Sequence, residues 1–303
     1  MGETGLLKLI FLLMMHANPQ LTDKTAIPSA PCDSSRCELK ILSWNIYMLP
    51  SLIMPSGIRT RAKYIAGHLE QSDFDIVVFQ EAFNPRARQV LWSMLKDKFP
   101  YAEGPANSEK PSLRLNSGVW ILSKIPLTTL GEVEFSRAQG FDMFSRKGAL
   151  MVEGDHNGTL FQLIGTHLNA GETQKIRNIQ YLEIRDSLLE PFRKDDVPQI
   201  ICGDFNTDKG DRVSYTHMIS TLRVPDYEVH GACLYSYDGL HNDLMAPGYK
   251  SQDIFDYIFL EPNGIASTSA TRTFRRFSDA WSHHHTDLSD HYAVTAQISF
   301  SGN

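Results

Sequence analysis

The chain has 303 residues, of which 42% are hydrophobic and 21% charged. These proportions exclude a disordered, collagen-like or coiled-coil protein and allow one or two folded domains. The formal net charge of −6 disfavours non-specific nucleic-acid binding, although it leaves room for a local basic groove. No apolar run reaches the roughly 18 residues that a membrane span needs, which predicts a soluble or peripheral protein.

The first 37 residues have the composition of a leader. An apolar run over 6–15, followed by the small residue Ala17, is typical of a short secretory signal peptide. A first helix or a frayed tail is the alternative. We predict that 1–37 is signal peptide and leader, and that the protein is secreted or extracytoplasmic. Cys32 and Cys37 flank a polar loop and could pair in an oxidising compartment.

From residue 38 onward, short apolar runs alternate with amphipathic stretches. The apolar runs predict strands at 40–47, 75–79, 118–123, 161–168, 199–203, 254–260 and 292–300. Apolar residues at helical intervals predict helices at 59–70, 85–98 and 172–192. Asn157-Gly158 predicts a tight hairpin turn, because this pair readily adopts positive φ angles. With no linker inside 38–300, we expect one α/β domain over 38–303, with two packed sheets and helices outside.

Several predicted strands end in, or are preceded by, polar residues of similar kinds. These motifs are Ser43-Trp44-Asn45, Phe79-Gln80-Glu81, Thr166-His167-Leu168-Asn169, Gly203-Asp204-Phe205-Asn206 and Ser289-Asp290-His291. Side chains alternate along a strand, so His167 shares a face with Asn169, and Asp204 shares one with Asn206. Asp256 lies inside an apolar strand, where a carboxylate must be paired or hydrogen-bonded. We therefore expect one polar pocket at these strand ends.

These residue types suit phosphoryl chemistry. A hard divalent cation prefers carboxylate and amide oxygens, which four side chains offer: Asn45, Glu81, Asp204 and Asp290. His291 is a base that titrates near neutral pH, and Asp256 could hold its tautomer. Charge that develops on phosphorus needs hydrogen-bond donors, for which the candidates are His167, Asn169 and Asn206. Each motif alone is a weak signal, and their combination in this order is specific.

Together, these motifs resemble the endonuclease/exonuclease/phosphatase superfamily over about residues 39–300. The resemblance implies a four-layered, deoxyribonuclease-like α/β sandwich that cleaves phosphoester bonds with Mg²⁺. Three further features resemble the neutral sphingomyelinases of secreted bacterial type. They are Asp142 with Lys147 five residues later, Thr166-His167-Leu168-Asn169-Ala170 followed by Arg177 and Gln180, and Ser289-Asp290-His291-Tyr292.

The resemblance implies peripheral contact with membranes and hydrolysis of sphingomyelin to ceramide and phosphocholine. It implies Mg²⁺ as cofactor, with Mn²⁺ or Co²⁺ as substitutes, and neither a nucleic-acid nor a protein partner is inferred. The implied roles are metal binding by Glu81 with Asn45, proton abstraction by His291, water orientation by Asp204 and Asn206, and charge stabilisation by His167, Asn169 and Lys147. Asp142 is close enough along a short loop to direct Lys147 through an ion pair. In the open, such a pair would be worth under about 1 kcal/mol and would position the lysine without stabilising the fold. A nuclease of the same superfamily and a catalytically idle lipid-binding protein are the alternatives.

Other features leave two interpretations open. Arg177 and Gln180 share a predicted helix face and could brace the His167 strand or contact substrate. The interval 271–287 is shorter than the aromatic hairpin of secreted relatives, so its aromatic residues are either core or a small membrane-facing patch. The run 283–285 of three histidines is expected in a surface loop rather than at a zinc ion. Asn84 stands where relatives have an acid, which puts a second metal there in doubt.

Overall fold

The computed structural model describes residues 38–50, 57–108, 113–171, 174–226, 228–246, 248–265 and 268–300. The predicted signal peptide and the Cys32 and Cys37 pair lie outside these residues. None of the helices within the described ranges is both long and apolar enough to cross a membrane.

Two mixed β-sheets form the centre of the domain. The first contains β1 (Glu38–Asn45), β2 (Ile76–Gln80), β3 (Tyr101–Glu103), β4 (Trp120–Ser123), β12 (Thr268–Arg275) and β13 (Ala293–Phe300), in the order β12-β13-β1-β2-β4-β3. The second contains β5 (Leu127–Glu134), β6 (Gly148–His156), β7 (Thr159–His167), β8 (Gln199–Asp204) and β11 (Asp256–Glu261), in the order β11-β8-β7-β6-β5. The strands β9 (Tyr237–Asp238) and β10 (Gln252–Asp253) form a separate pair.

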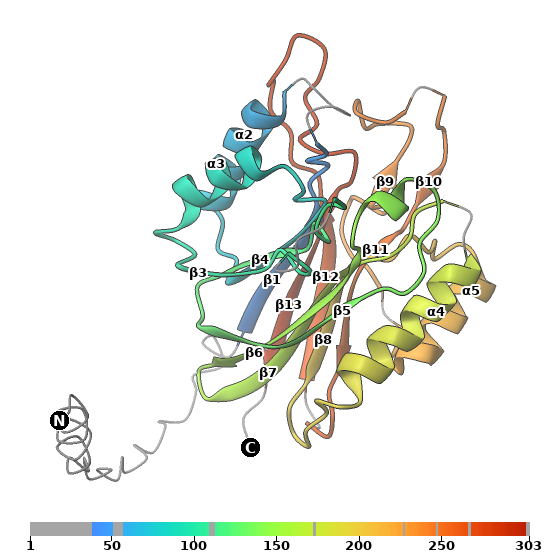
Figure 1. Cartoon of the computed structure of the whole chain (residues 1–303). Helices are drawn as coiled ribbons and strands as arrows, with labels where there is room; N and C mark the ends of the chain where they lie inside the picture. Colours follow the sequence, from blue (N-terminus) through green and yellow to red (C-terminus); the bar gives the residue numbers. More distant parts are fainter. Residues whose placement is uncertain are drawn as a thin grey trace, which may run out of the picture. The chain divides into compact units, whose positions relative to one another are not determined.

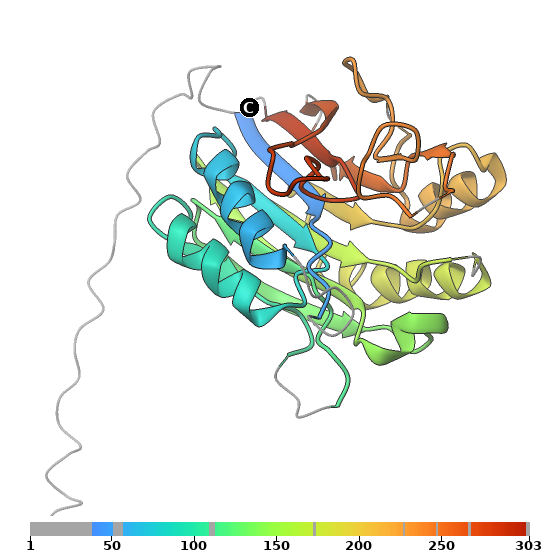
Figure 2. The same ribbon diagram turned by 90° about the horizontal axis from the view of Figure 1, so that it is seen from above.

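Helices cover the outer face of each sheet (Figure 1 and Figure 2). On the first sheet these are α2 (Ile58–Glu70) and α3 (Pro85–Leu95). On the second they are α4 (Gln174–Ile184), which continues into a π-helical turn over Arg185–Leu189, and α5 (Arg212–Leu222). The four layers confirm the α/β sandwich that the sequence predicts.

The alternation of side chains along β1 explains how the layers pack. Leu39 and Ile41 enter the core between the two sheets, whereas Leu42 and Trp44 enter the core beneath α2 and α3. Because each central strand has a sheet on one side and helices on the other, both of its faces must be apolar. The sequence shows this as nearly continuous hydrophobic runs.

The predicted hairpin joins β6 to β7. Asn157 and Gly158 have φ angles of 55° and 88°, and the Gly158 N–H donates to Asp155 Oδ1 over 2.6 Å. The predicted elements did not include β3, β5, β9, β10, β12 or α5. The edge strand β5 is only half-buried and carries threonine and glutamate among its apolar residues. The residues of α5 include valine, threonine and isoleucine, which favour strands, and its start is marked only by the Asp211 side chain, which accepts from Ser214 N.

The aromatic residues of 271–287 belong to the core. Phe274 and Phe277 are buried, and Trp281 packs against the cluster beneath α2 and α3. This packing supports the core interpretation and not the membrane-facing patch. Of the neighbouring histidines, His283 and His284 are exposed, as expected of a surface loop, while the His285 ring stacks on Trp281.

Candidate active site

The site lies at one end of the core between the sheets. On five strands (β1, β2, β7, β8 and β11), the side-chain positions that face this core end in a polar residue. These residues are Asn45, Gln80, His167, Asp204 and Asp256, and all of them are buried. The strands β7 and β8 are parallel, and the antiparallel β11 begins beside the end of β8, where Asp256 pairs with Asp204. Packing the two sheets therefore brings the strand ends to one place.

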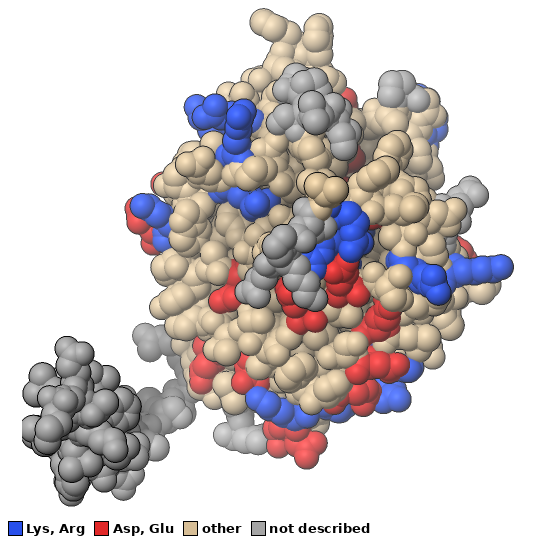
Figure 3. Space-filling view, in the orientation of Figure 1, with Lys and Arg blue, Asp and Glu red and all other residues tan. Residues whose placement is uncertain are grey.

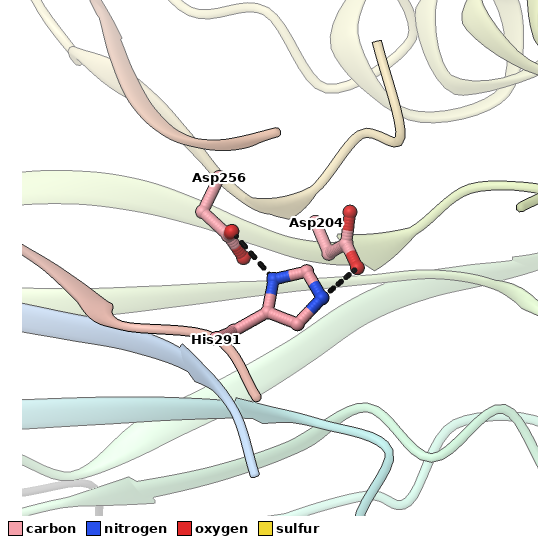
Figure 4. Close-up of side chains that lie close together, drawn as sticks. All are labelled: Asp204, Asp256 and His291. Carbon is pink, nitrogen blue, oxygen red and sulfur yellow. Dashed lines mark hydrogen bonds and ion pairs between the residues drawn. The ribbon is translucent and has the colours of Figure 1, made fainter. Parts of the chain in front are cut away.

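His291 lies between two carboxylates (Figure 4). Its Nδ1 is 2.8 Å from Asp256 Oδ2, and its Nε2 is 3.7 Å from Asp204 Oδ2. Burial alone would lower the pKa of His291, but the carboxylates of Asp256 and Asp204 outweigh burial and hold it well above the usual value. The pKa of His291 is therefore above the near-neutral value expected from the sequence, and the hydrogen bond between Nδ1 and Asp256 orients the ring so that Nε2 faces Asp204.

These three residues could together hold a metal ion. An ion placed among them would break the hydrogen bond between Asp256 and His291, and the geometry favours that hydrogen bond, with Asp204 at ion-pair distance on the other side of the ring. Asp204 is also held from other sides. Its Oδ2 accepts from Asn45 Nδ2 over 3.0 Å, and its Oδ1 accepts from the Asn206 N–H over 2.9 Å.

Lys147 has the ion pair with Asp142 that the sequence predicts. Its Nζ lies 2.8 Å from Asp142 Oδ1, 2.9 Å from the Leu168 carbonyl oxygen and 2.8 Å from His167 Nε2. Because an ammonium group only donates, His167 accepts at Nε2, and burial together with Lys147 lowers the pKa of His167 well below its usual value. The Lys147 and Asp142 side chains are only 4% and 14% exposed, so the pair is not the open surface pair expected from the sequence.

Glu81 and Asp290 have the chemistry of a cation site. Glu81 follows β2 with a φ of 54°, and its Oε2 is buried without a hydrogen-bond partner among the described residues. Burial and then the Asp290 carboxylate raise the pKa of Glu81 to about 7. Two such carboxylates on one cavity fit a hard divalent cation. Asn45 fits less directly, because its Oδ1 already accepts from the Tyr47 N–H.

The loop that carries Asp290 and His291 is held by Arg61 and Asn242, which the sequence analysis did not single out, and by Trp44, which it named only as part of a motif. Arg61 donates to the Leu288 carbonyl over 2.8 Å, Trp44 Nε1 donates to the His291 carbonyl over 2.9 Å, and Asn242 Nδ2 donates to Ser289 and Asp290 carbonyls. A signal for Arg61 was present, since it lies three residues after Ile58 on the buried face of α2.

The Asn169 side chain is directed into the fold. Its Oδ1 accepts from the Gln139 N–H and its Nδ2 donates to the Ala170 carbonyl, each over 2.8 Å. Arg177 donates to the Asn169 carbonyl, and Gln180 Oε1 accepts from the Asn169 N–H, so both residues brace this loop. Asn84, the residue that departs from relatives, caps α3.

Two cavities meet at Glu81 and Ala170. The polar cavity, of about 580 Å³, is lined by six of the predicted site residues: Glu81, His167, Asp204, Asn206, Asp290 and His291. The apolar cavity, of about 320 Å³, is lined mainly by Leu49, Pro50, Phe83, Leu115, Phe141 and Phe144. Asp142 and Lys147 lie on the wall of the apolar cavity. The arrangement can accept a phosphodiester in one cavity and an apolar group in the other.

Known proteins are similar to this chain in both architecture and sequence. Phospholipase C of Staphylococcus aureus is 28% identical over 97% of this chain and 96% of its own length. The crystal structure of sphingomyelinase C from Streptomyces griseocarneus covers 86% of this chain and 99% of its own, with a TM-score of 0.77 and 26% identity. A variant of Staphylococcus aureus beta toxin with bound magnesium ions covers the same shares with a TM-score of 0.74 and 27% identity.

The match to a family extends over most of the domain. A model of the endonuclease/exonuclease/phosphatase family matches residues 42–291, the segment that contains every predicted site residue. This confirms the resemblance found in the sequence motifs. The chain belongs to the endonuclease/exonuclease/phosphatase family, and within it is similar to bacterial sphingomyelinase C.

Proposed function

We propose that this protein is a divalent-cation-dependent phosphodiesterase that hydrolyses sphingomyelin to ceramide and phosphocholine. One observation carries the proposal: the polar cavity with the Asp256, His291 and Asp204 chain shares Glu81 with an apolar cavity. A lipid phosphodiester has this same division, with a charged phosphate next to long apolar chains. The similarity to sphingomyelinase C from several bacteria supports the same substrate class.

We assign each step of the phosphodiester hydrolysis to residues that line the polar cavity or contact its lining. His291 Nε2 would take the proton of the attacking water, and Asp256 would stabilise the imidazolium that forms. Asp204 and Asn206 would orient that water. His167, which lines the polar cavity, and Lys147, which contacts His167 from the wall of the apolar cavity, would stabilise the charge that develops on phosphorus.

Glu81 and Asp290 are the residues that would hold the cation, with Asn45 supporting Asp204 beside them. When bound there, Mg²⁺ would neutralise a phosphate oxygen and the departing alkoxide as a Lewis acid. The buried, unpartnered Glu81 Oε2 is the feature of this chain that supports such a cation. We extend the proposal to Mn²⁺ and Co²⁺, which accept similar oxygen ligands.

An exposed apolar segment borders the apolar cavity. Phe141, Met143 and Phe144 lie on the 3₁₀ turn Gly140–Phe144 and are 89%, 57% and 67% exposed. Phe141 and Phe144 also line the cavity wall. Exposed apolar clusters mark interaction sites. Because this cluster borders the cavity that Glu81 also lines, we place the peripheral membrane contact on this segment. Secretion, predicted from residues 1–37, remains part of the proposal.

Two other functions fit less well. A nuclease would need a basic surface, whereas the described Lys and Arg side chains on the face in Figure 3 form separate groups with Asp and Glu between them. A catalytically idle lipid-binding protein would not need the buried chain of Asp256, His291 and Asp204, which is costly to maintain.

The proposal is tested with purified protein and three substrates in parallel: sphingomyelin vesicles, phosphatidylcholine vesicles and plasmid DNA, each with Mg²⁺ or with EDTA. We expect Mg²⁺-dependent release of phosphocholine from sphingomyelin, loss of this activity in EDTA, and intact plasmid. Faster nicking of plasmid than cleavage of sphingomyelin would show that the substrate class is wrong. No cleavage of any substrate would support the idle protein.

A further inference from the structure

Three aromatic rings form one wall of the polar cavity, and the mechanism above gives them no role. We call this wall, made of Tyr237, Tyr249 and Phe255, the aromatic corner. The Tyr237 and Tyr249 rings lie nearly perpendicular, at 76°, with centroids 5.1 Å apart. The Phe255 ring is 5.5 Å from Tyr237, at 54°. All three side chains are only partly buried, so their ring surfaces remain open to the cavity.

The aromatic corner lies next to the reactive histidine. The Tyr237 and His291 rings are 4.6 Å apart, and a β-bridge joins the two residues. The Tyr292 N–H also donates to the Ser236 carbonyl over 2.7 Å, which fixes β9 against the loop that carries His291. A group attached to phosphorus through two carbons would therefore reach these rings while the phosphate stays beside His291.

The charge around the aromatic corner favours a cation. Five carboxylates line the polar cavity: Glu81, Asp204, Asp208, Asp211 and Asp290. The only lysine or arginine among the described lining residues is Arg177, whose guanidinium donates to the Asn169 and Gly171 carbonyls and to Gln174. The Tyr249 hydroxyl donates to Asp253 over 2.5 Å, which holds that ring in place.

These observations distinguish two kinds of cationic head group. A quaternary ammonium has no N–H to donate, so it binds best against aromatic faces in a negative environment. A primary ammonium needs acceptor oxygens close to its three hydrogens, and aromatic faces are a poorer substitute. We infer that the aromatic corner binds the quaternary ammonium of a phosphocholine head group and so selects choline over ethanolamine phosphodiesters. This inference rests on the proposed function.

The test measures selectivity, since a loss of overall rate alone has other causes. The ratio of kcat/KM for sphingomyelin to that for ceramide phosphoethanolamine, in matched vesicles with Mg²⁺, should exceed about tenfold in the wild type. Tyr249→Leu and Phe255→Leu should each lower this ratio several-fold. Tyr249→Phe, which keeps the ring, and Tyr64→Leu, which removes a partly exposed tyrosine on α2 outside the cavity, should preserve it.

Two results would overturn the inference. One is a wild-type ratio near 1, and the other is an equal loss on both lipids in the leucine variants, which would show that the rings only support the fold. Calorimetric titration with phosphocholine and phosphoethanolamine separates this inference from the proposed function. The wild type could cleave neither lipid and still bind phosphocholine more tightly than phosphoethanolamine. If Tyr249→Leu then removes this binding preference, the inference about the aromatic corner holds and the proposed activity is wrong. Equal or absent binding of both compounds would reject the inference.

Discussion

Glu81 combines two unusual properties at a single residue. Its backbone lies in the left-handed region, and its Oε2 is buried without a partner among the described residues. Such strain and desolvation are typical of functional positions, where a ligand compensates for them. The neighbouring charge of Asp290 makes a cation the natural ligand.

We predict that Glu81→Gln lowers sphingomyelin turnover at least about 100-fold at low Mg²⁺ and that additional Mg²⁺ restores part of it. In EDTA the variant should melt at the same or a higher temperature, because it no longer buries a carboxylate beside Asp290. Magnesium titrations of activity, with calorimetry of Mg²⁺ binding, measure the first effect. A near wild-type rate at low Mg²⁺ would remove Glu81 from the metal site.

His291 should be essential to turnover without being essential to the fold. We predict that His291→Ala lowers turnover by about 10² to 10⁴ while vesicle sedimentation shows unchanged lipid binding. His283→Ala, at an exposed histidine of the same loop region, is the matched control and should retain full activity. A His291→Ala rate within tenfold of the wild type would mean that His291 is structural.

Lys147 should affect stability as well as activity. The sequence suggested an open ion pair with Asp142, for which removal of the lysine would leave the melting temperature unchanged. The pair is buried, so Lys147→Met should abolish turnover and also destabilise the fold by about 3 kcal/mol, since Asp142 is left without its cation. The double variant Asp142→Asn with Lys147→Met should recover much of the stability but no activity. Recovery of turnover in the double variant would contradict a catalytic role.

At the scale of elements, the turn Gly140–Phe144 carries the proposed membrane contact. We predict that Phe141→Ser with Phe144→Ser reduces binding to sphingomyelin vesicles and turnover on them about tenfold or more, because two exposed rings no longer leave water. Leu160→Ser is the control, since Leu160 is 43% exposed at the start of β7, at the opposite end of that strand from His167, and lines neither cavity. Equal vesicle binding by wild type and the phenylalanine variant would place the membrane contact elsewhere.

The local hydrophobic pattern of the sequence was sufficient to predict the central strands. It was not sufficient to predict contacts between segments that are distant in the sequence. The strands were predictable because burial on both faces leaves continuous apolar runs, as in β8. The buried position of Phe277 could not be predicted, because it depends on packing against Trp44. The two ring centroids are 4.9 Å apart, although more than 200 residues separate them in the sequence. The aromatic corner was missed for the same reason, since Tyr237 lies on the two-residue strand β9 while Tyr249 and Phe255 lie outside the strands, and no periodicity of the sequence relates the three rings.

At the scale of the whole molecule, the site exists only where the two sheets meet. Asp204 and Asp256 belong to the second sheet, whereas Asn45 ends a strand of the first and His291 precedes another. The hydrogen bond between Asn45 and Asp204 crosses the gap between the sheets. Candidate residues could be found from the ends of predicted strands, but their distances, the buried Lys147 pair and the inward direction of Asn169 required the packed structure.

The central claim is that water attacks the phosphorus of sphingomyelin in this cavity. The most direct test is hydrolysis of sphingomyelin vesicles in H₂¹⁸O with Mg²⁺, followed by mass spectrometry of both products. We expect phosphocholine that carries one ¹⁸O atom and ceramide that carries none, because water attacks phosphorus and the bond from phosphorus to the ceramide oxygen breaks. Label in the ceramide hydroxyl, release of free choline with ceramide phosphate, or no products at all would contradict the claim.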